Sequence, residues 1–174
     1  MLNNLRFQID YSDVEVTDKI GSLAVQEILN NEELYPDLVN RVGGRLTDPE
    51  NAFVRSNLQN LSSEQGQFLD FVGSGFMDAG EFGEFSLDVR VSHLVSFKRQ
   101  SSAIQPLCEN AGTTSEPEWR ANVTAGWTNG PWGANASARY VGETEDIIGG
   151  RVNGGCEPET RLQSVDSYTE FGLN

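Results

Sequence analysis

Apolar and polar side chains alternate strictly along residues 118–128 and again along residues 132–140. Such alternation with a period of two places one set of side chains on each face of a β-strand. The turn sequence Asn129-Gly130-Pro131 separates the two runs, so together they predict an antiparallel hairpin. The apolar face of this hairpin would carry Trp119, Ala121, Val123, Ala125, Trp127, Trp132, Ala134, Ala136, Ala138 and Tyr140.

Four further segments are expected to be strands. Residues 85–97 alternate in the same way over their whole length. Residues 5–11 also alternate, but the apolar positions change phase at Val14, which predicts a β-bulge. Residues 52–77 and 165–174 have an extended but less regular pattern. The sequence therefore predicts about six strands.

The hairpin has aromatic residues at both ends of its apolar face. Trp119 and Trp127 end one strand and Trp132 and Tyr140 end the other, each pair eight residues apart. At roughly 3.3 Å per residue this spacing is about 26 Å along the strand. A tilt near 40° reduces it to about 20 Å, close to the roughly 25 Å apolar band of a membrane barrel. The four aromatics are therefore predicted to form a girdle at the two membrane interfaces. The inner face of a two-layer β-sandwich is the alternative.

Short and long connections alternate along the chain. Residues 78–81 and 129–131 are short, whereas residues 18–51, 99–117 and 143–164 are long, polar and rich in Gly, Asn, Glu and Pro. Outer-membrane barrels have short periplasmic turns and long extracellular loops. This pattern predicts that the three long segments lie together on the extracellular side.

The first long connection has a helical pattern, and the other two carry the cysteines. We expect a helix over residues 19–30, capped by Asp18, and a short turn over residues 35–39. The apolar stripe of this helix is interpreted as a packing surface. Cys108 and Cys156 fit either a disulfide between two loops or two free thiols.

Composition narrows the protein classes. Only 37% of the 174 residues are hydrophobic, and 26 acidic against 12 basic residues give a net charge of −14. Such acidity disfavours nucleic acid as a partner, because neutralising phosphates requires a basic surface. The sequence has no run of about 18 apolar residues that would predict a transmembrane helix, and its N-terminus has no signal-peptide pattern.

Candidate chemistry is sparse. The sequence has no phosphate-binding loop, zinc-protease motif or calcium loop, and the only histidine, His93, is interpreted as an interfacial or packing residue. We therefore predict no enzyme, metal site or cofactor. In a barrel the polar side chains opposite the apolar face would line the lumen, and the candidates are Asp88, Arg90, Arg120, Asn122 and Arg139.

Four stretches together resemble the C-terminal part of the barrel of TonB-dependent outer-membrane receptors. They are residues 5–21 (LRFQIDYSDVEVTDKIG), 57–71 (NLQNLSSEQGQFLDF), 117–140, which begins Pro-Glu-Trp-Arg, and 165–173, which begins Val-Asp-Ser-Tyr-Thr. Phe68 is a departure, because a glycine is usual there, and the strand register around it is left open. The resemblance covers most of the chain apart from its loops.

This resemblance implies a fold, a location and a function. The expected fold is all-β: residues 1–174 form about six strands of a larger antiparallel up-and-down transmembrane β-barrel, with long extracellular loops, one carrying a short helix. The plug domain and most of the barrel would lie outside these residues. The whole receptor would sit in the bacterial outer membrane among its lipids. It would bind a scarce solute (an iron chelate, a vitamin or an oligosaccharide) and import it with energy transmitted by TonB through the plug.

Two other functions fit the residues alone. The first is a soluble β-sandwich that binds carbohydrate, in which the tryptophans are core or sugar-stacking residues. The second is a passive porin-like barrel without a plug. Because a single open sheet would expose its apolar face and both edges to water, we also expect the chain not to fold stably without lipid or detergent.

Overall fold

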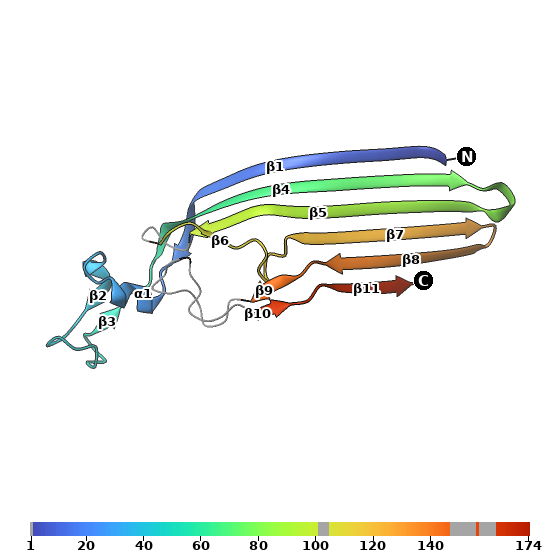
Figure 1. The fold of residues 1–174 in the computed structure, drawn as a ribbon. Helices are drawn as coiled ribbons and strands as arrows, with labels where there is room; N and C mark the ends of the chain where they lie inside the picture. The colour runs from blue at the N-terminus through green and yellow to red at the C-terminus, as the bar shows by residue number, and fades with distance from the viewer. Residues whose placement is uncertain (1, 101–104, 147–155, 157–162) are drawn as a thin grey trace.

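One antiparallel sheet makes up most of the molecule (Figure 1). The computed structural model describes residues 2–100, 105–146, 156 and 163–174. Along the sheet the order is β1-β4-β5-β7-β8-β11, so each main strand pairs with the next main strand along the chain. These strands span Leu2–Ser22 (β1), Leu58–Asp78 (β4), Glu84–Gln100 (β5), Trp119–Asn129 (β7), Trp132–Val141 (β8) and Tyr168–Leu173 (β11). The chain is thus an all-β up-and-down meander, as the alternation predicted.

The smaller elements lie in the connections. They are α1 (Val25–Asn30), η1 (Pro36–Leu38), β2 (Val39–Asn40), β3 (Phe53–Val54), η2 (Gly80–Phe82), β6 (Cys108–Glu109), β9 (Thr144–Asp146) and β10 (Gln163–Val165). The strand β6 adds to β5, while β2 pairs with β3 and β9 pairs with β10. Except for η2, all of these elements lie at one end of the sheet, and the two short turns lie at the other end with both termini (Figure 1). We call these the loop end and the turn end.

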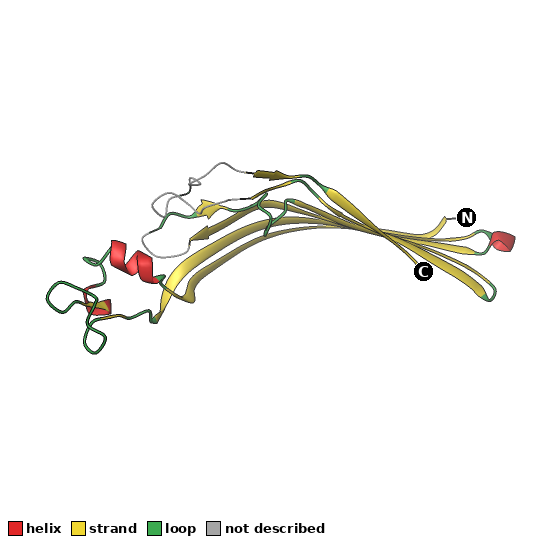
Figure 2. Ribbon diagram, turned by 90° about the horizontal axis from the view of Figure 1, so that it is seen from below, coloured by secondary structure: helices red, strands yellow, loops and turns green. Residues whose placement is uncertain are grey.

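The sheet is a single twisted layer, seen almost edge-on in Figure 2. Among the described residues no second sheet or helix covers either face, and β1 and β11 are open edges. Only six hydrophobic side chains in this part of the chain are buried: Leu23, Ile28, Leu38, Leu94, Cys108 and Val141. Three of these, Leu23, Ile28 and Leu38, form a small core around α1 at the loop end. The sheet is therefore held by its hydrogen-bonded ladders and cross-strand contacts and has no central core.

The first connection differs from its predicted form. Residues 19–22 continue β1, and the helix is only Val25–Asn30, with Ala24 at its N-cap. Asp18 therefore caps no helix. Pairing of this segment with β4 outweighs its helical periodicity, because Ile20 and its neighbours find ladder partners there. The short turn at residues 35–39 is confirmed, since Pro36 begins η1.

Strand register corrects two further expectations. Between Arg6 and Val16 the β1–β4 register is unbroken, so the bulge predicted at Val14 is wrong. Val14 and Tyr11 lie on different faces of the sheet, because they are three residues apart in one strand. The register shift near Phe68 instead belongs to β5: Phe68 pairs with Leu94 and Gln67 pairs with Ser96, so Val95 is the extra residue.

Two predicted strands also have different bounds. The segment predicted as one strand over residues 52–77 is divided, because β3 is Phe53–Val54 and β4 begins at Leu58. The final strand predicted over residues 165–174 is likewise divided between β10 and β11.

The two short turns contact each other at the turn end. Trp127 donates its indole N–H to the carbonyl of Phe82 at 2.7 Å, which joins β7 to the β4–β5 turn. Gly83 closes that turn with φ +87°, and a Cβ built there would lie 2.2 Å from the carbonyl oxygen of Thr128. Only glycine fits this position, because it tolerates the positive φ and leaves room for the neighbouring backbone.

Candidate functional site

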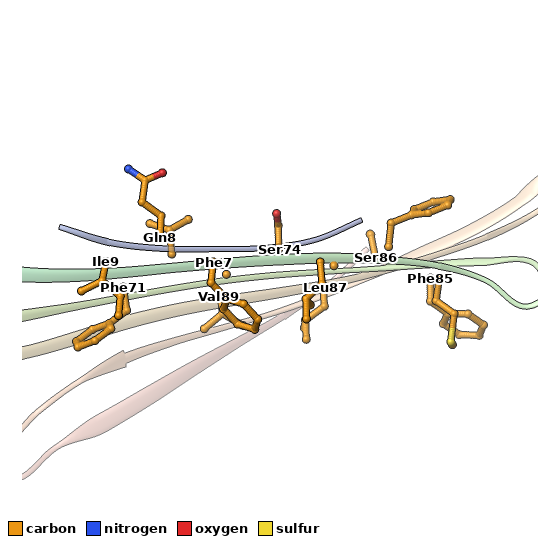
Figure 3. Close-up of a pocket in the computed structure, with 15 residues that line it drawn as sticks. Phe7, Gln8, Ile9, Phe71, Ser74, Phe85, Ser86, Leu87 and Val89 are labelled. Atoms are coloured by element: carbon orange, nitrogen blue, oxygen red, sulfur yellow. The ribbon is translucent and has the colours of Figure 1, made fainter. Parts of the chain in front are cut away.

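The two faces of the sheet have opposite chemistry. Figure 3 shows Phe7, Ile9, Phe71 and Val89 projecting from one side of the sheet, with Gln8 and Ser74 on the other. The pairing registers extend this division across all six strands, from Phe7 on β1 to Phe171 on β11. We call these the apolar face and the polar face.

The apolar face is uncovered in the described part of the chain. Its side chains are exposed to an unusual degree for their type: 74% for Phe7, 73% for Trp132 and 81% for Phe171. A shallow groove of about 690 Å³ runs over β1, β4 and β5 and is lined almost entirely by apolar side chains. Monomeric soluble proteins rarely leave so continuous an apolar surface in water, and such surfaces are typical of sites that contact lipid or another protein.

Amphipathic rings cross the apolar face at the loop end. Tyr11 pairs with Leu69, Leu69 with His93, and His93 with Trp119, which places them in one row across four strands. The rings of His93 and Trp119 stack with their centroids 4.0 Å apart. Tyr140 pairs with Ala121, two residues from Trp119, and extends the row onto β8. We call this the upper aromatic row.

A second group of aromatics occupies the same face at the turn end. Trp127 pairs with Phe85 on one side and with Ala134 on the other, and Trp132 faces Asn129. All four aromatics predicted as a girdle thus lie on the apolar face, two at each end. Between the two groups, β7 and β8 carry small or aliphatic side chains such as Val123 on this face, whereas Phe7, Phe71 and Phe171 occupy the same middle band on other strands.

Beyond the upper aromatic row the two faces exchange polarity. On the apolar side, Gln67 donates to the Asp13 carboxylate at 3.2 Å and Gln65 donates to Glu15 at 3.1 Å. On the opposite side, the ring of Phe68 packs over Gly66, next to buried Leu94. The extra residue Val95 produces the exchange on β5, because it shifts the later side chains of that strand by one position. The apolar band therefore has a sharp upper boundary.

The polar face carries all five residues predicted as lumen wall. Asn122 lies directly opposite Arg90 on β5 and Arg139 on β8, and Arg120 is two residues away on the same strand. Asp88 pairs with Thr124 one rung further toward the turn end. The structure therefore brings these five side chains together in adjacent strands.

Ion pairs concentrate near the loop end. Glu64 accepts hydrogen bonds from Lys19 at 2.6 Å and from Arg99 at 2.9 Å, joining β1, β4 and β5. In the first long connection, Arg41 pairs with Glu32, and this guanidinium lowers the pKa of the Glu32 carboxyl below its ordinary value.

Asp48 organises the tip of the same connection. Its carboxylate accepts the backbone N–H groups of Glu50 at 3.0 Å and Asn51 at 3.1 Å. These hydrogen bonds stabilise the charged form and lower the pKa of Asp48.

Cys108 and Cys156 form a disulfide, with their Cα atoms 5.1 Å apart. It joins the connection before β7 to Cys156. Backbone hydrogen bonds join the connection before β7 to β9: Glu145 donates to Gly112 at 2.8 Å, and Thr114 donates to Glu145 at 3.2 Å. Residues 105–118 and β9 therefore form one bonded unit at the loop end of β7 and β8, which we call the two-loop unit.

Sequence reasoning missed part of this arrangement. Tyr11 was not assigned to the girdle, although it is the last residue of its apolar run before Asp13 and Glu15 continue the same face. That change from apolar to acidic residues was the available signal. The contact between His93 and Trp119 had none, because it depends on the β5–β7 register.

Other types of site have no candidate residues in the described part of the chain. Among the residues that the structure describes, no three His, Cys, Asp or Glu side chains are grouped so as to hold a metal ion. In the same residues no helix is long and apolar enough to cross a membrane. Comparison with protein-family models, with curated proteins and with solved structures finds no match to this chain.

Proposed function

We propose that this chain forms six strands of the wall of an outer-membrane β-barrel belonging to a TonB-dependent transporter. The transporter would bind a scarce solute (an iron chelate, a vitamin or an oligosaccharide) at its loop end and import it with energy transmitted by TonB. The observation that carries the barrel part of this proposal is the exposed apolar face, bounded at both ends by amphipathic rings.

Lipid is the environment that fits this face. The upper aromatic row and the tryptophans at the turn end are about 20 Å apart along the membrane normal if the strands tilt by about 40°. Trp and Tyr favour the two interfaces, where the ring is in an apolar layer and the polar atom reaches water. The exchange of polarity beyond the upper row supports an upper membrane boundary at that level.

The polar face suits a watery lumen. Charged side chains such as Asp88 and Arg90 cost little free energy there, whereas they would be unstable against lipid. The disulfide at the loop end favours an oxidising compartment for that end, because such bonds persist mainly outside the cytosol.

The open edges favour a larger barrel. In a bilayer the outer backbone groups of β1 and β11 would need hydrogen-bond partners, because hydrocarbon offers none. Six strands do not close a barrel of the plugged 22-stranded class, so additional strands would complete the wall.

The transporter part of the proposal rests on the resemblance of four stretches to TonB-dependent receptors, and a plug would dock against the polar face. The carbohydrate-binding sandwich is disfavoured, since the described residues form no second layer to bury the tryptophans. A passive porin-like barrel would have the same kind of wall but would not need TonB.

Spin labels on neighbouring residues test the barrel. Both native cysteines are in the disulfide, so Val89→Cys and Arg90→Cys can each be labelled alone. In vesicles we expect the label at 89 to be accessible to oxygen dissolved in lipid. The label at 90 should instead be accessible to a water-soluble nickel complex. Equal accessibility of both labels to the nickel complex would rule out a lipid-facing sheet.

The transport step needs a cellular measurement. Cells that carry the complete receptor should accumulate the labelled solute only when TonB is present and the inner membrane is energised. Uptake at the same rate without TonB would favour the passive porin instead.

A further inference from the structure

A cavity lies on the polar face beneath the two-loop unit. Its volume is about 330 Å³, within the range of small-molecule sites. Arg120 of β7 and Arg139 of β8 line it from the sheet, and Tyr168 of β11 lines it from the side. Thr114 and Thr144 line it from the loops. Two arginines, two threonines and a tyrosine from separate elements therefore line one space.

The charges around this cavity are unusual for so acidic a chain. Two guanidinium groups line it against one carboxylate, that of Asp166. Among the described residues neither Arg120 nor Arg139 forms an ion pair, although Glu170 lies opposite Arg139 on β11. The closest partner of Arg120 is the carbonyl of Ser115, at 3.5 Å. These two cations are thus available to a ligand.

Backbone hydrogen bonds hold the loop side of the cavity in place. Glu145 donates to Gly112 and Thr114 donates to Glu145, which joins the connection before β7 to β9. A preformed site loses less conformational entropy on binding than a site built from free loops. Arg90, which pairs with Asn122 across from Arg139, carries a third positive charge on the same face of the sheet.

We propose that this cavity binds the anionic group, carboxylate or phosphate, of the imported solute. Guanidinium forks match the oxygens of both groups and bind them through paired hydrogen bonds. The proposal deepens the proposed function and rests on it, since the polar face must be the lumen side for the solute to reach Arg120 and Arg139. It selects anionic solutes over neutral oligosaccharides.

The test is a titration of the chain in phosphatidylcholine vesicles, which supply no anionic lipid. Citrate and inorganic phosphate are the anionic probes, and maltotriose is the neutral control. Binding is measured by calorimetry at low salt. We expect saturable binding of citrate and phosphate, a lower affinity as salt increases, and no binding of maltotriose.

The decisive variant is Arg120→Gln/Arg139→Gln, which should weaken citrate binding at least about tenfold because the charge-assisted hydrogen bonds are lost. The matched control Arg6→Gln/Lys98→Gln removes the same charge from exposed sites elsewhere on the sheet and should bind as the unmodified chain does. Arg120→Lys/Arg139→Lys keeps the charge and should have an intermediate affinity.

The outcomes separate this inference from the proposed function. A chain that enters vesicles but binds neither anion, or binds them equally well in the decisive variant and the control, overturns the inference alone. A chain whose spin labels at positions 89 and 90 are equally accessible to the nickel complex overturns the proposed function. If the chain alone does not enter vesicles, the titration is made in zwitterionic micelles, where the same comparison of variants decides about the cavity.

Discussion

A charge placed in the middle of the apolar face gives the sharpest test of its environment. Val123 is four residues from Trp119 and four from Trp127, and it lies between Val89 and Ala138 on the neighbouring strands. In a bilayer it would be about 10 Å from each interface at a tilt of about 40°. Arginine at a lipid-facing position near the midplane costs about 2–4 kcal/mol. We therefore expect Val123→Arg to lower the ratio of folded to unfolded chain about 30-fold to 1000-fold.

Two arginine variants serve as controls. Thr124→Arg places the same group one residue away on the polar face and should change the free energy of unfolding by less than about 0.5 kcal/mol. Ala134→Arg lies on the apolar face beside Trp127, at the expected interface, and should cost about 0–1 kcal/mol. The assay is urea unfolding of the chain refolded into vesicles, followed by tryptophan emission.

The order of the three losses in unfolding free energy decides whether the apolar face contacts lipid. Lipid contact predicts Val123→Arg as the most destabilising variant, then Ala134→Arg, then Thr124→Arg. If Val123→Arg and Thr124→Arg were equally stable within about 0.5 kcal/mol, the apolar face would be in water and the reasoning would be refuted.

Three further predictions concern the turns and loops. Gly83→Ala should destabilise the sheet by more than about 2 kcal/mol because its new Cβ would overlap the backbone of β7. Gly130→Ala, also at positive φ but in open space, should cost only about 1–2 kcal/mol in the same urea assay. The turn held by Asp48 should be protected from amide exchange above the ordinary pKa of an aspartate. Because the folded pKa is lowered, this protection is lost as pH falls through that lowered value, and an Asp48→Asn variant should show no such pH dependence. Reducing the Cys108–Cys156 disulfide, with a sequence separation of 48, should destabilise the two-loop unit by at most about 4 kcal/mol. Proteolysis of this unit should then be faster after reduction, and an unchanged rate would show that the hydrogen bonds alone hold it.

Local patterns in the sequence were sufficient to predict the strands and their faces. The alternation around Trp119 and Trp132 specified a hairpin, because side chains in a strand alternate regardless of what the strand pairs with. The same rule placed Arg90, Arg120 and Arg139 on one face before their neighbours were known. The order of short and long connections likewise predicted that the loops lie at one end.

Helical periodicity was less reliable at the first long connection. The stripe from Ile20 to Ile28 fits a helix, yet its first part is a strand because β4 offers it backbone partners. The change of phase at Val14 predicts a bulge, whereas the unbroken register shows that an apolar residue occupies the other face of the strand. Local preference competes with long-range pairing in such segments, and the pairing wins where a partner strand is present.

Register is what only the tertiary structure decided. The row of Tyr11, His93 and Trp119 and the cluster of arginines around Asn122 join residues from different strands, and each depends on the exact alignment of those strands. A shift of one residue would send these side chains to the opposite face, and the extra residue Val95 makes such a shift within β5. The sequence by itself determined a six-stranded antiparallel sheet with one apolar face, because alternation is local. Which rings meet at its upper boundary and which arginines share a cavity was decided by cross-strand pairing between residues distant in sequence.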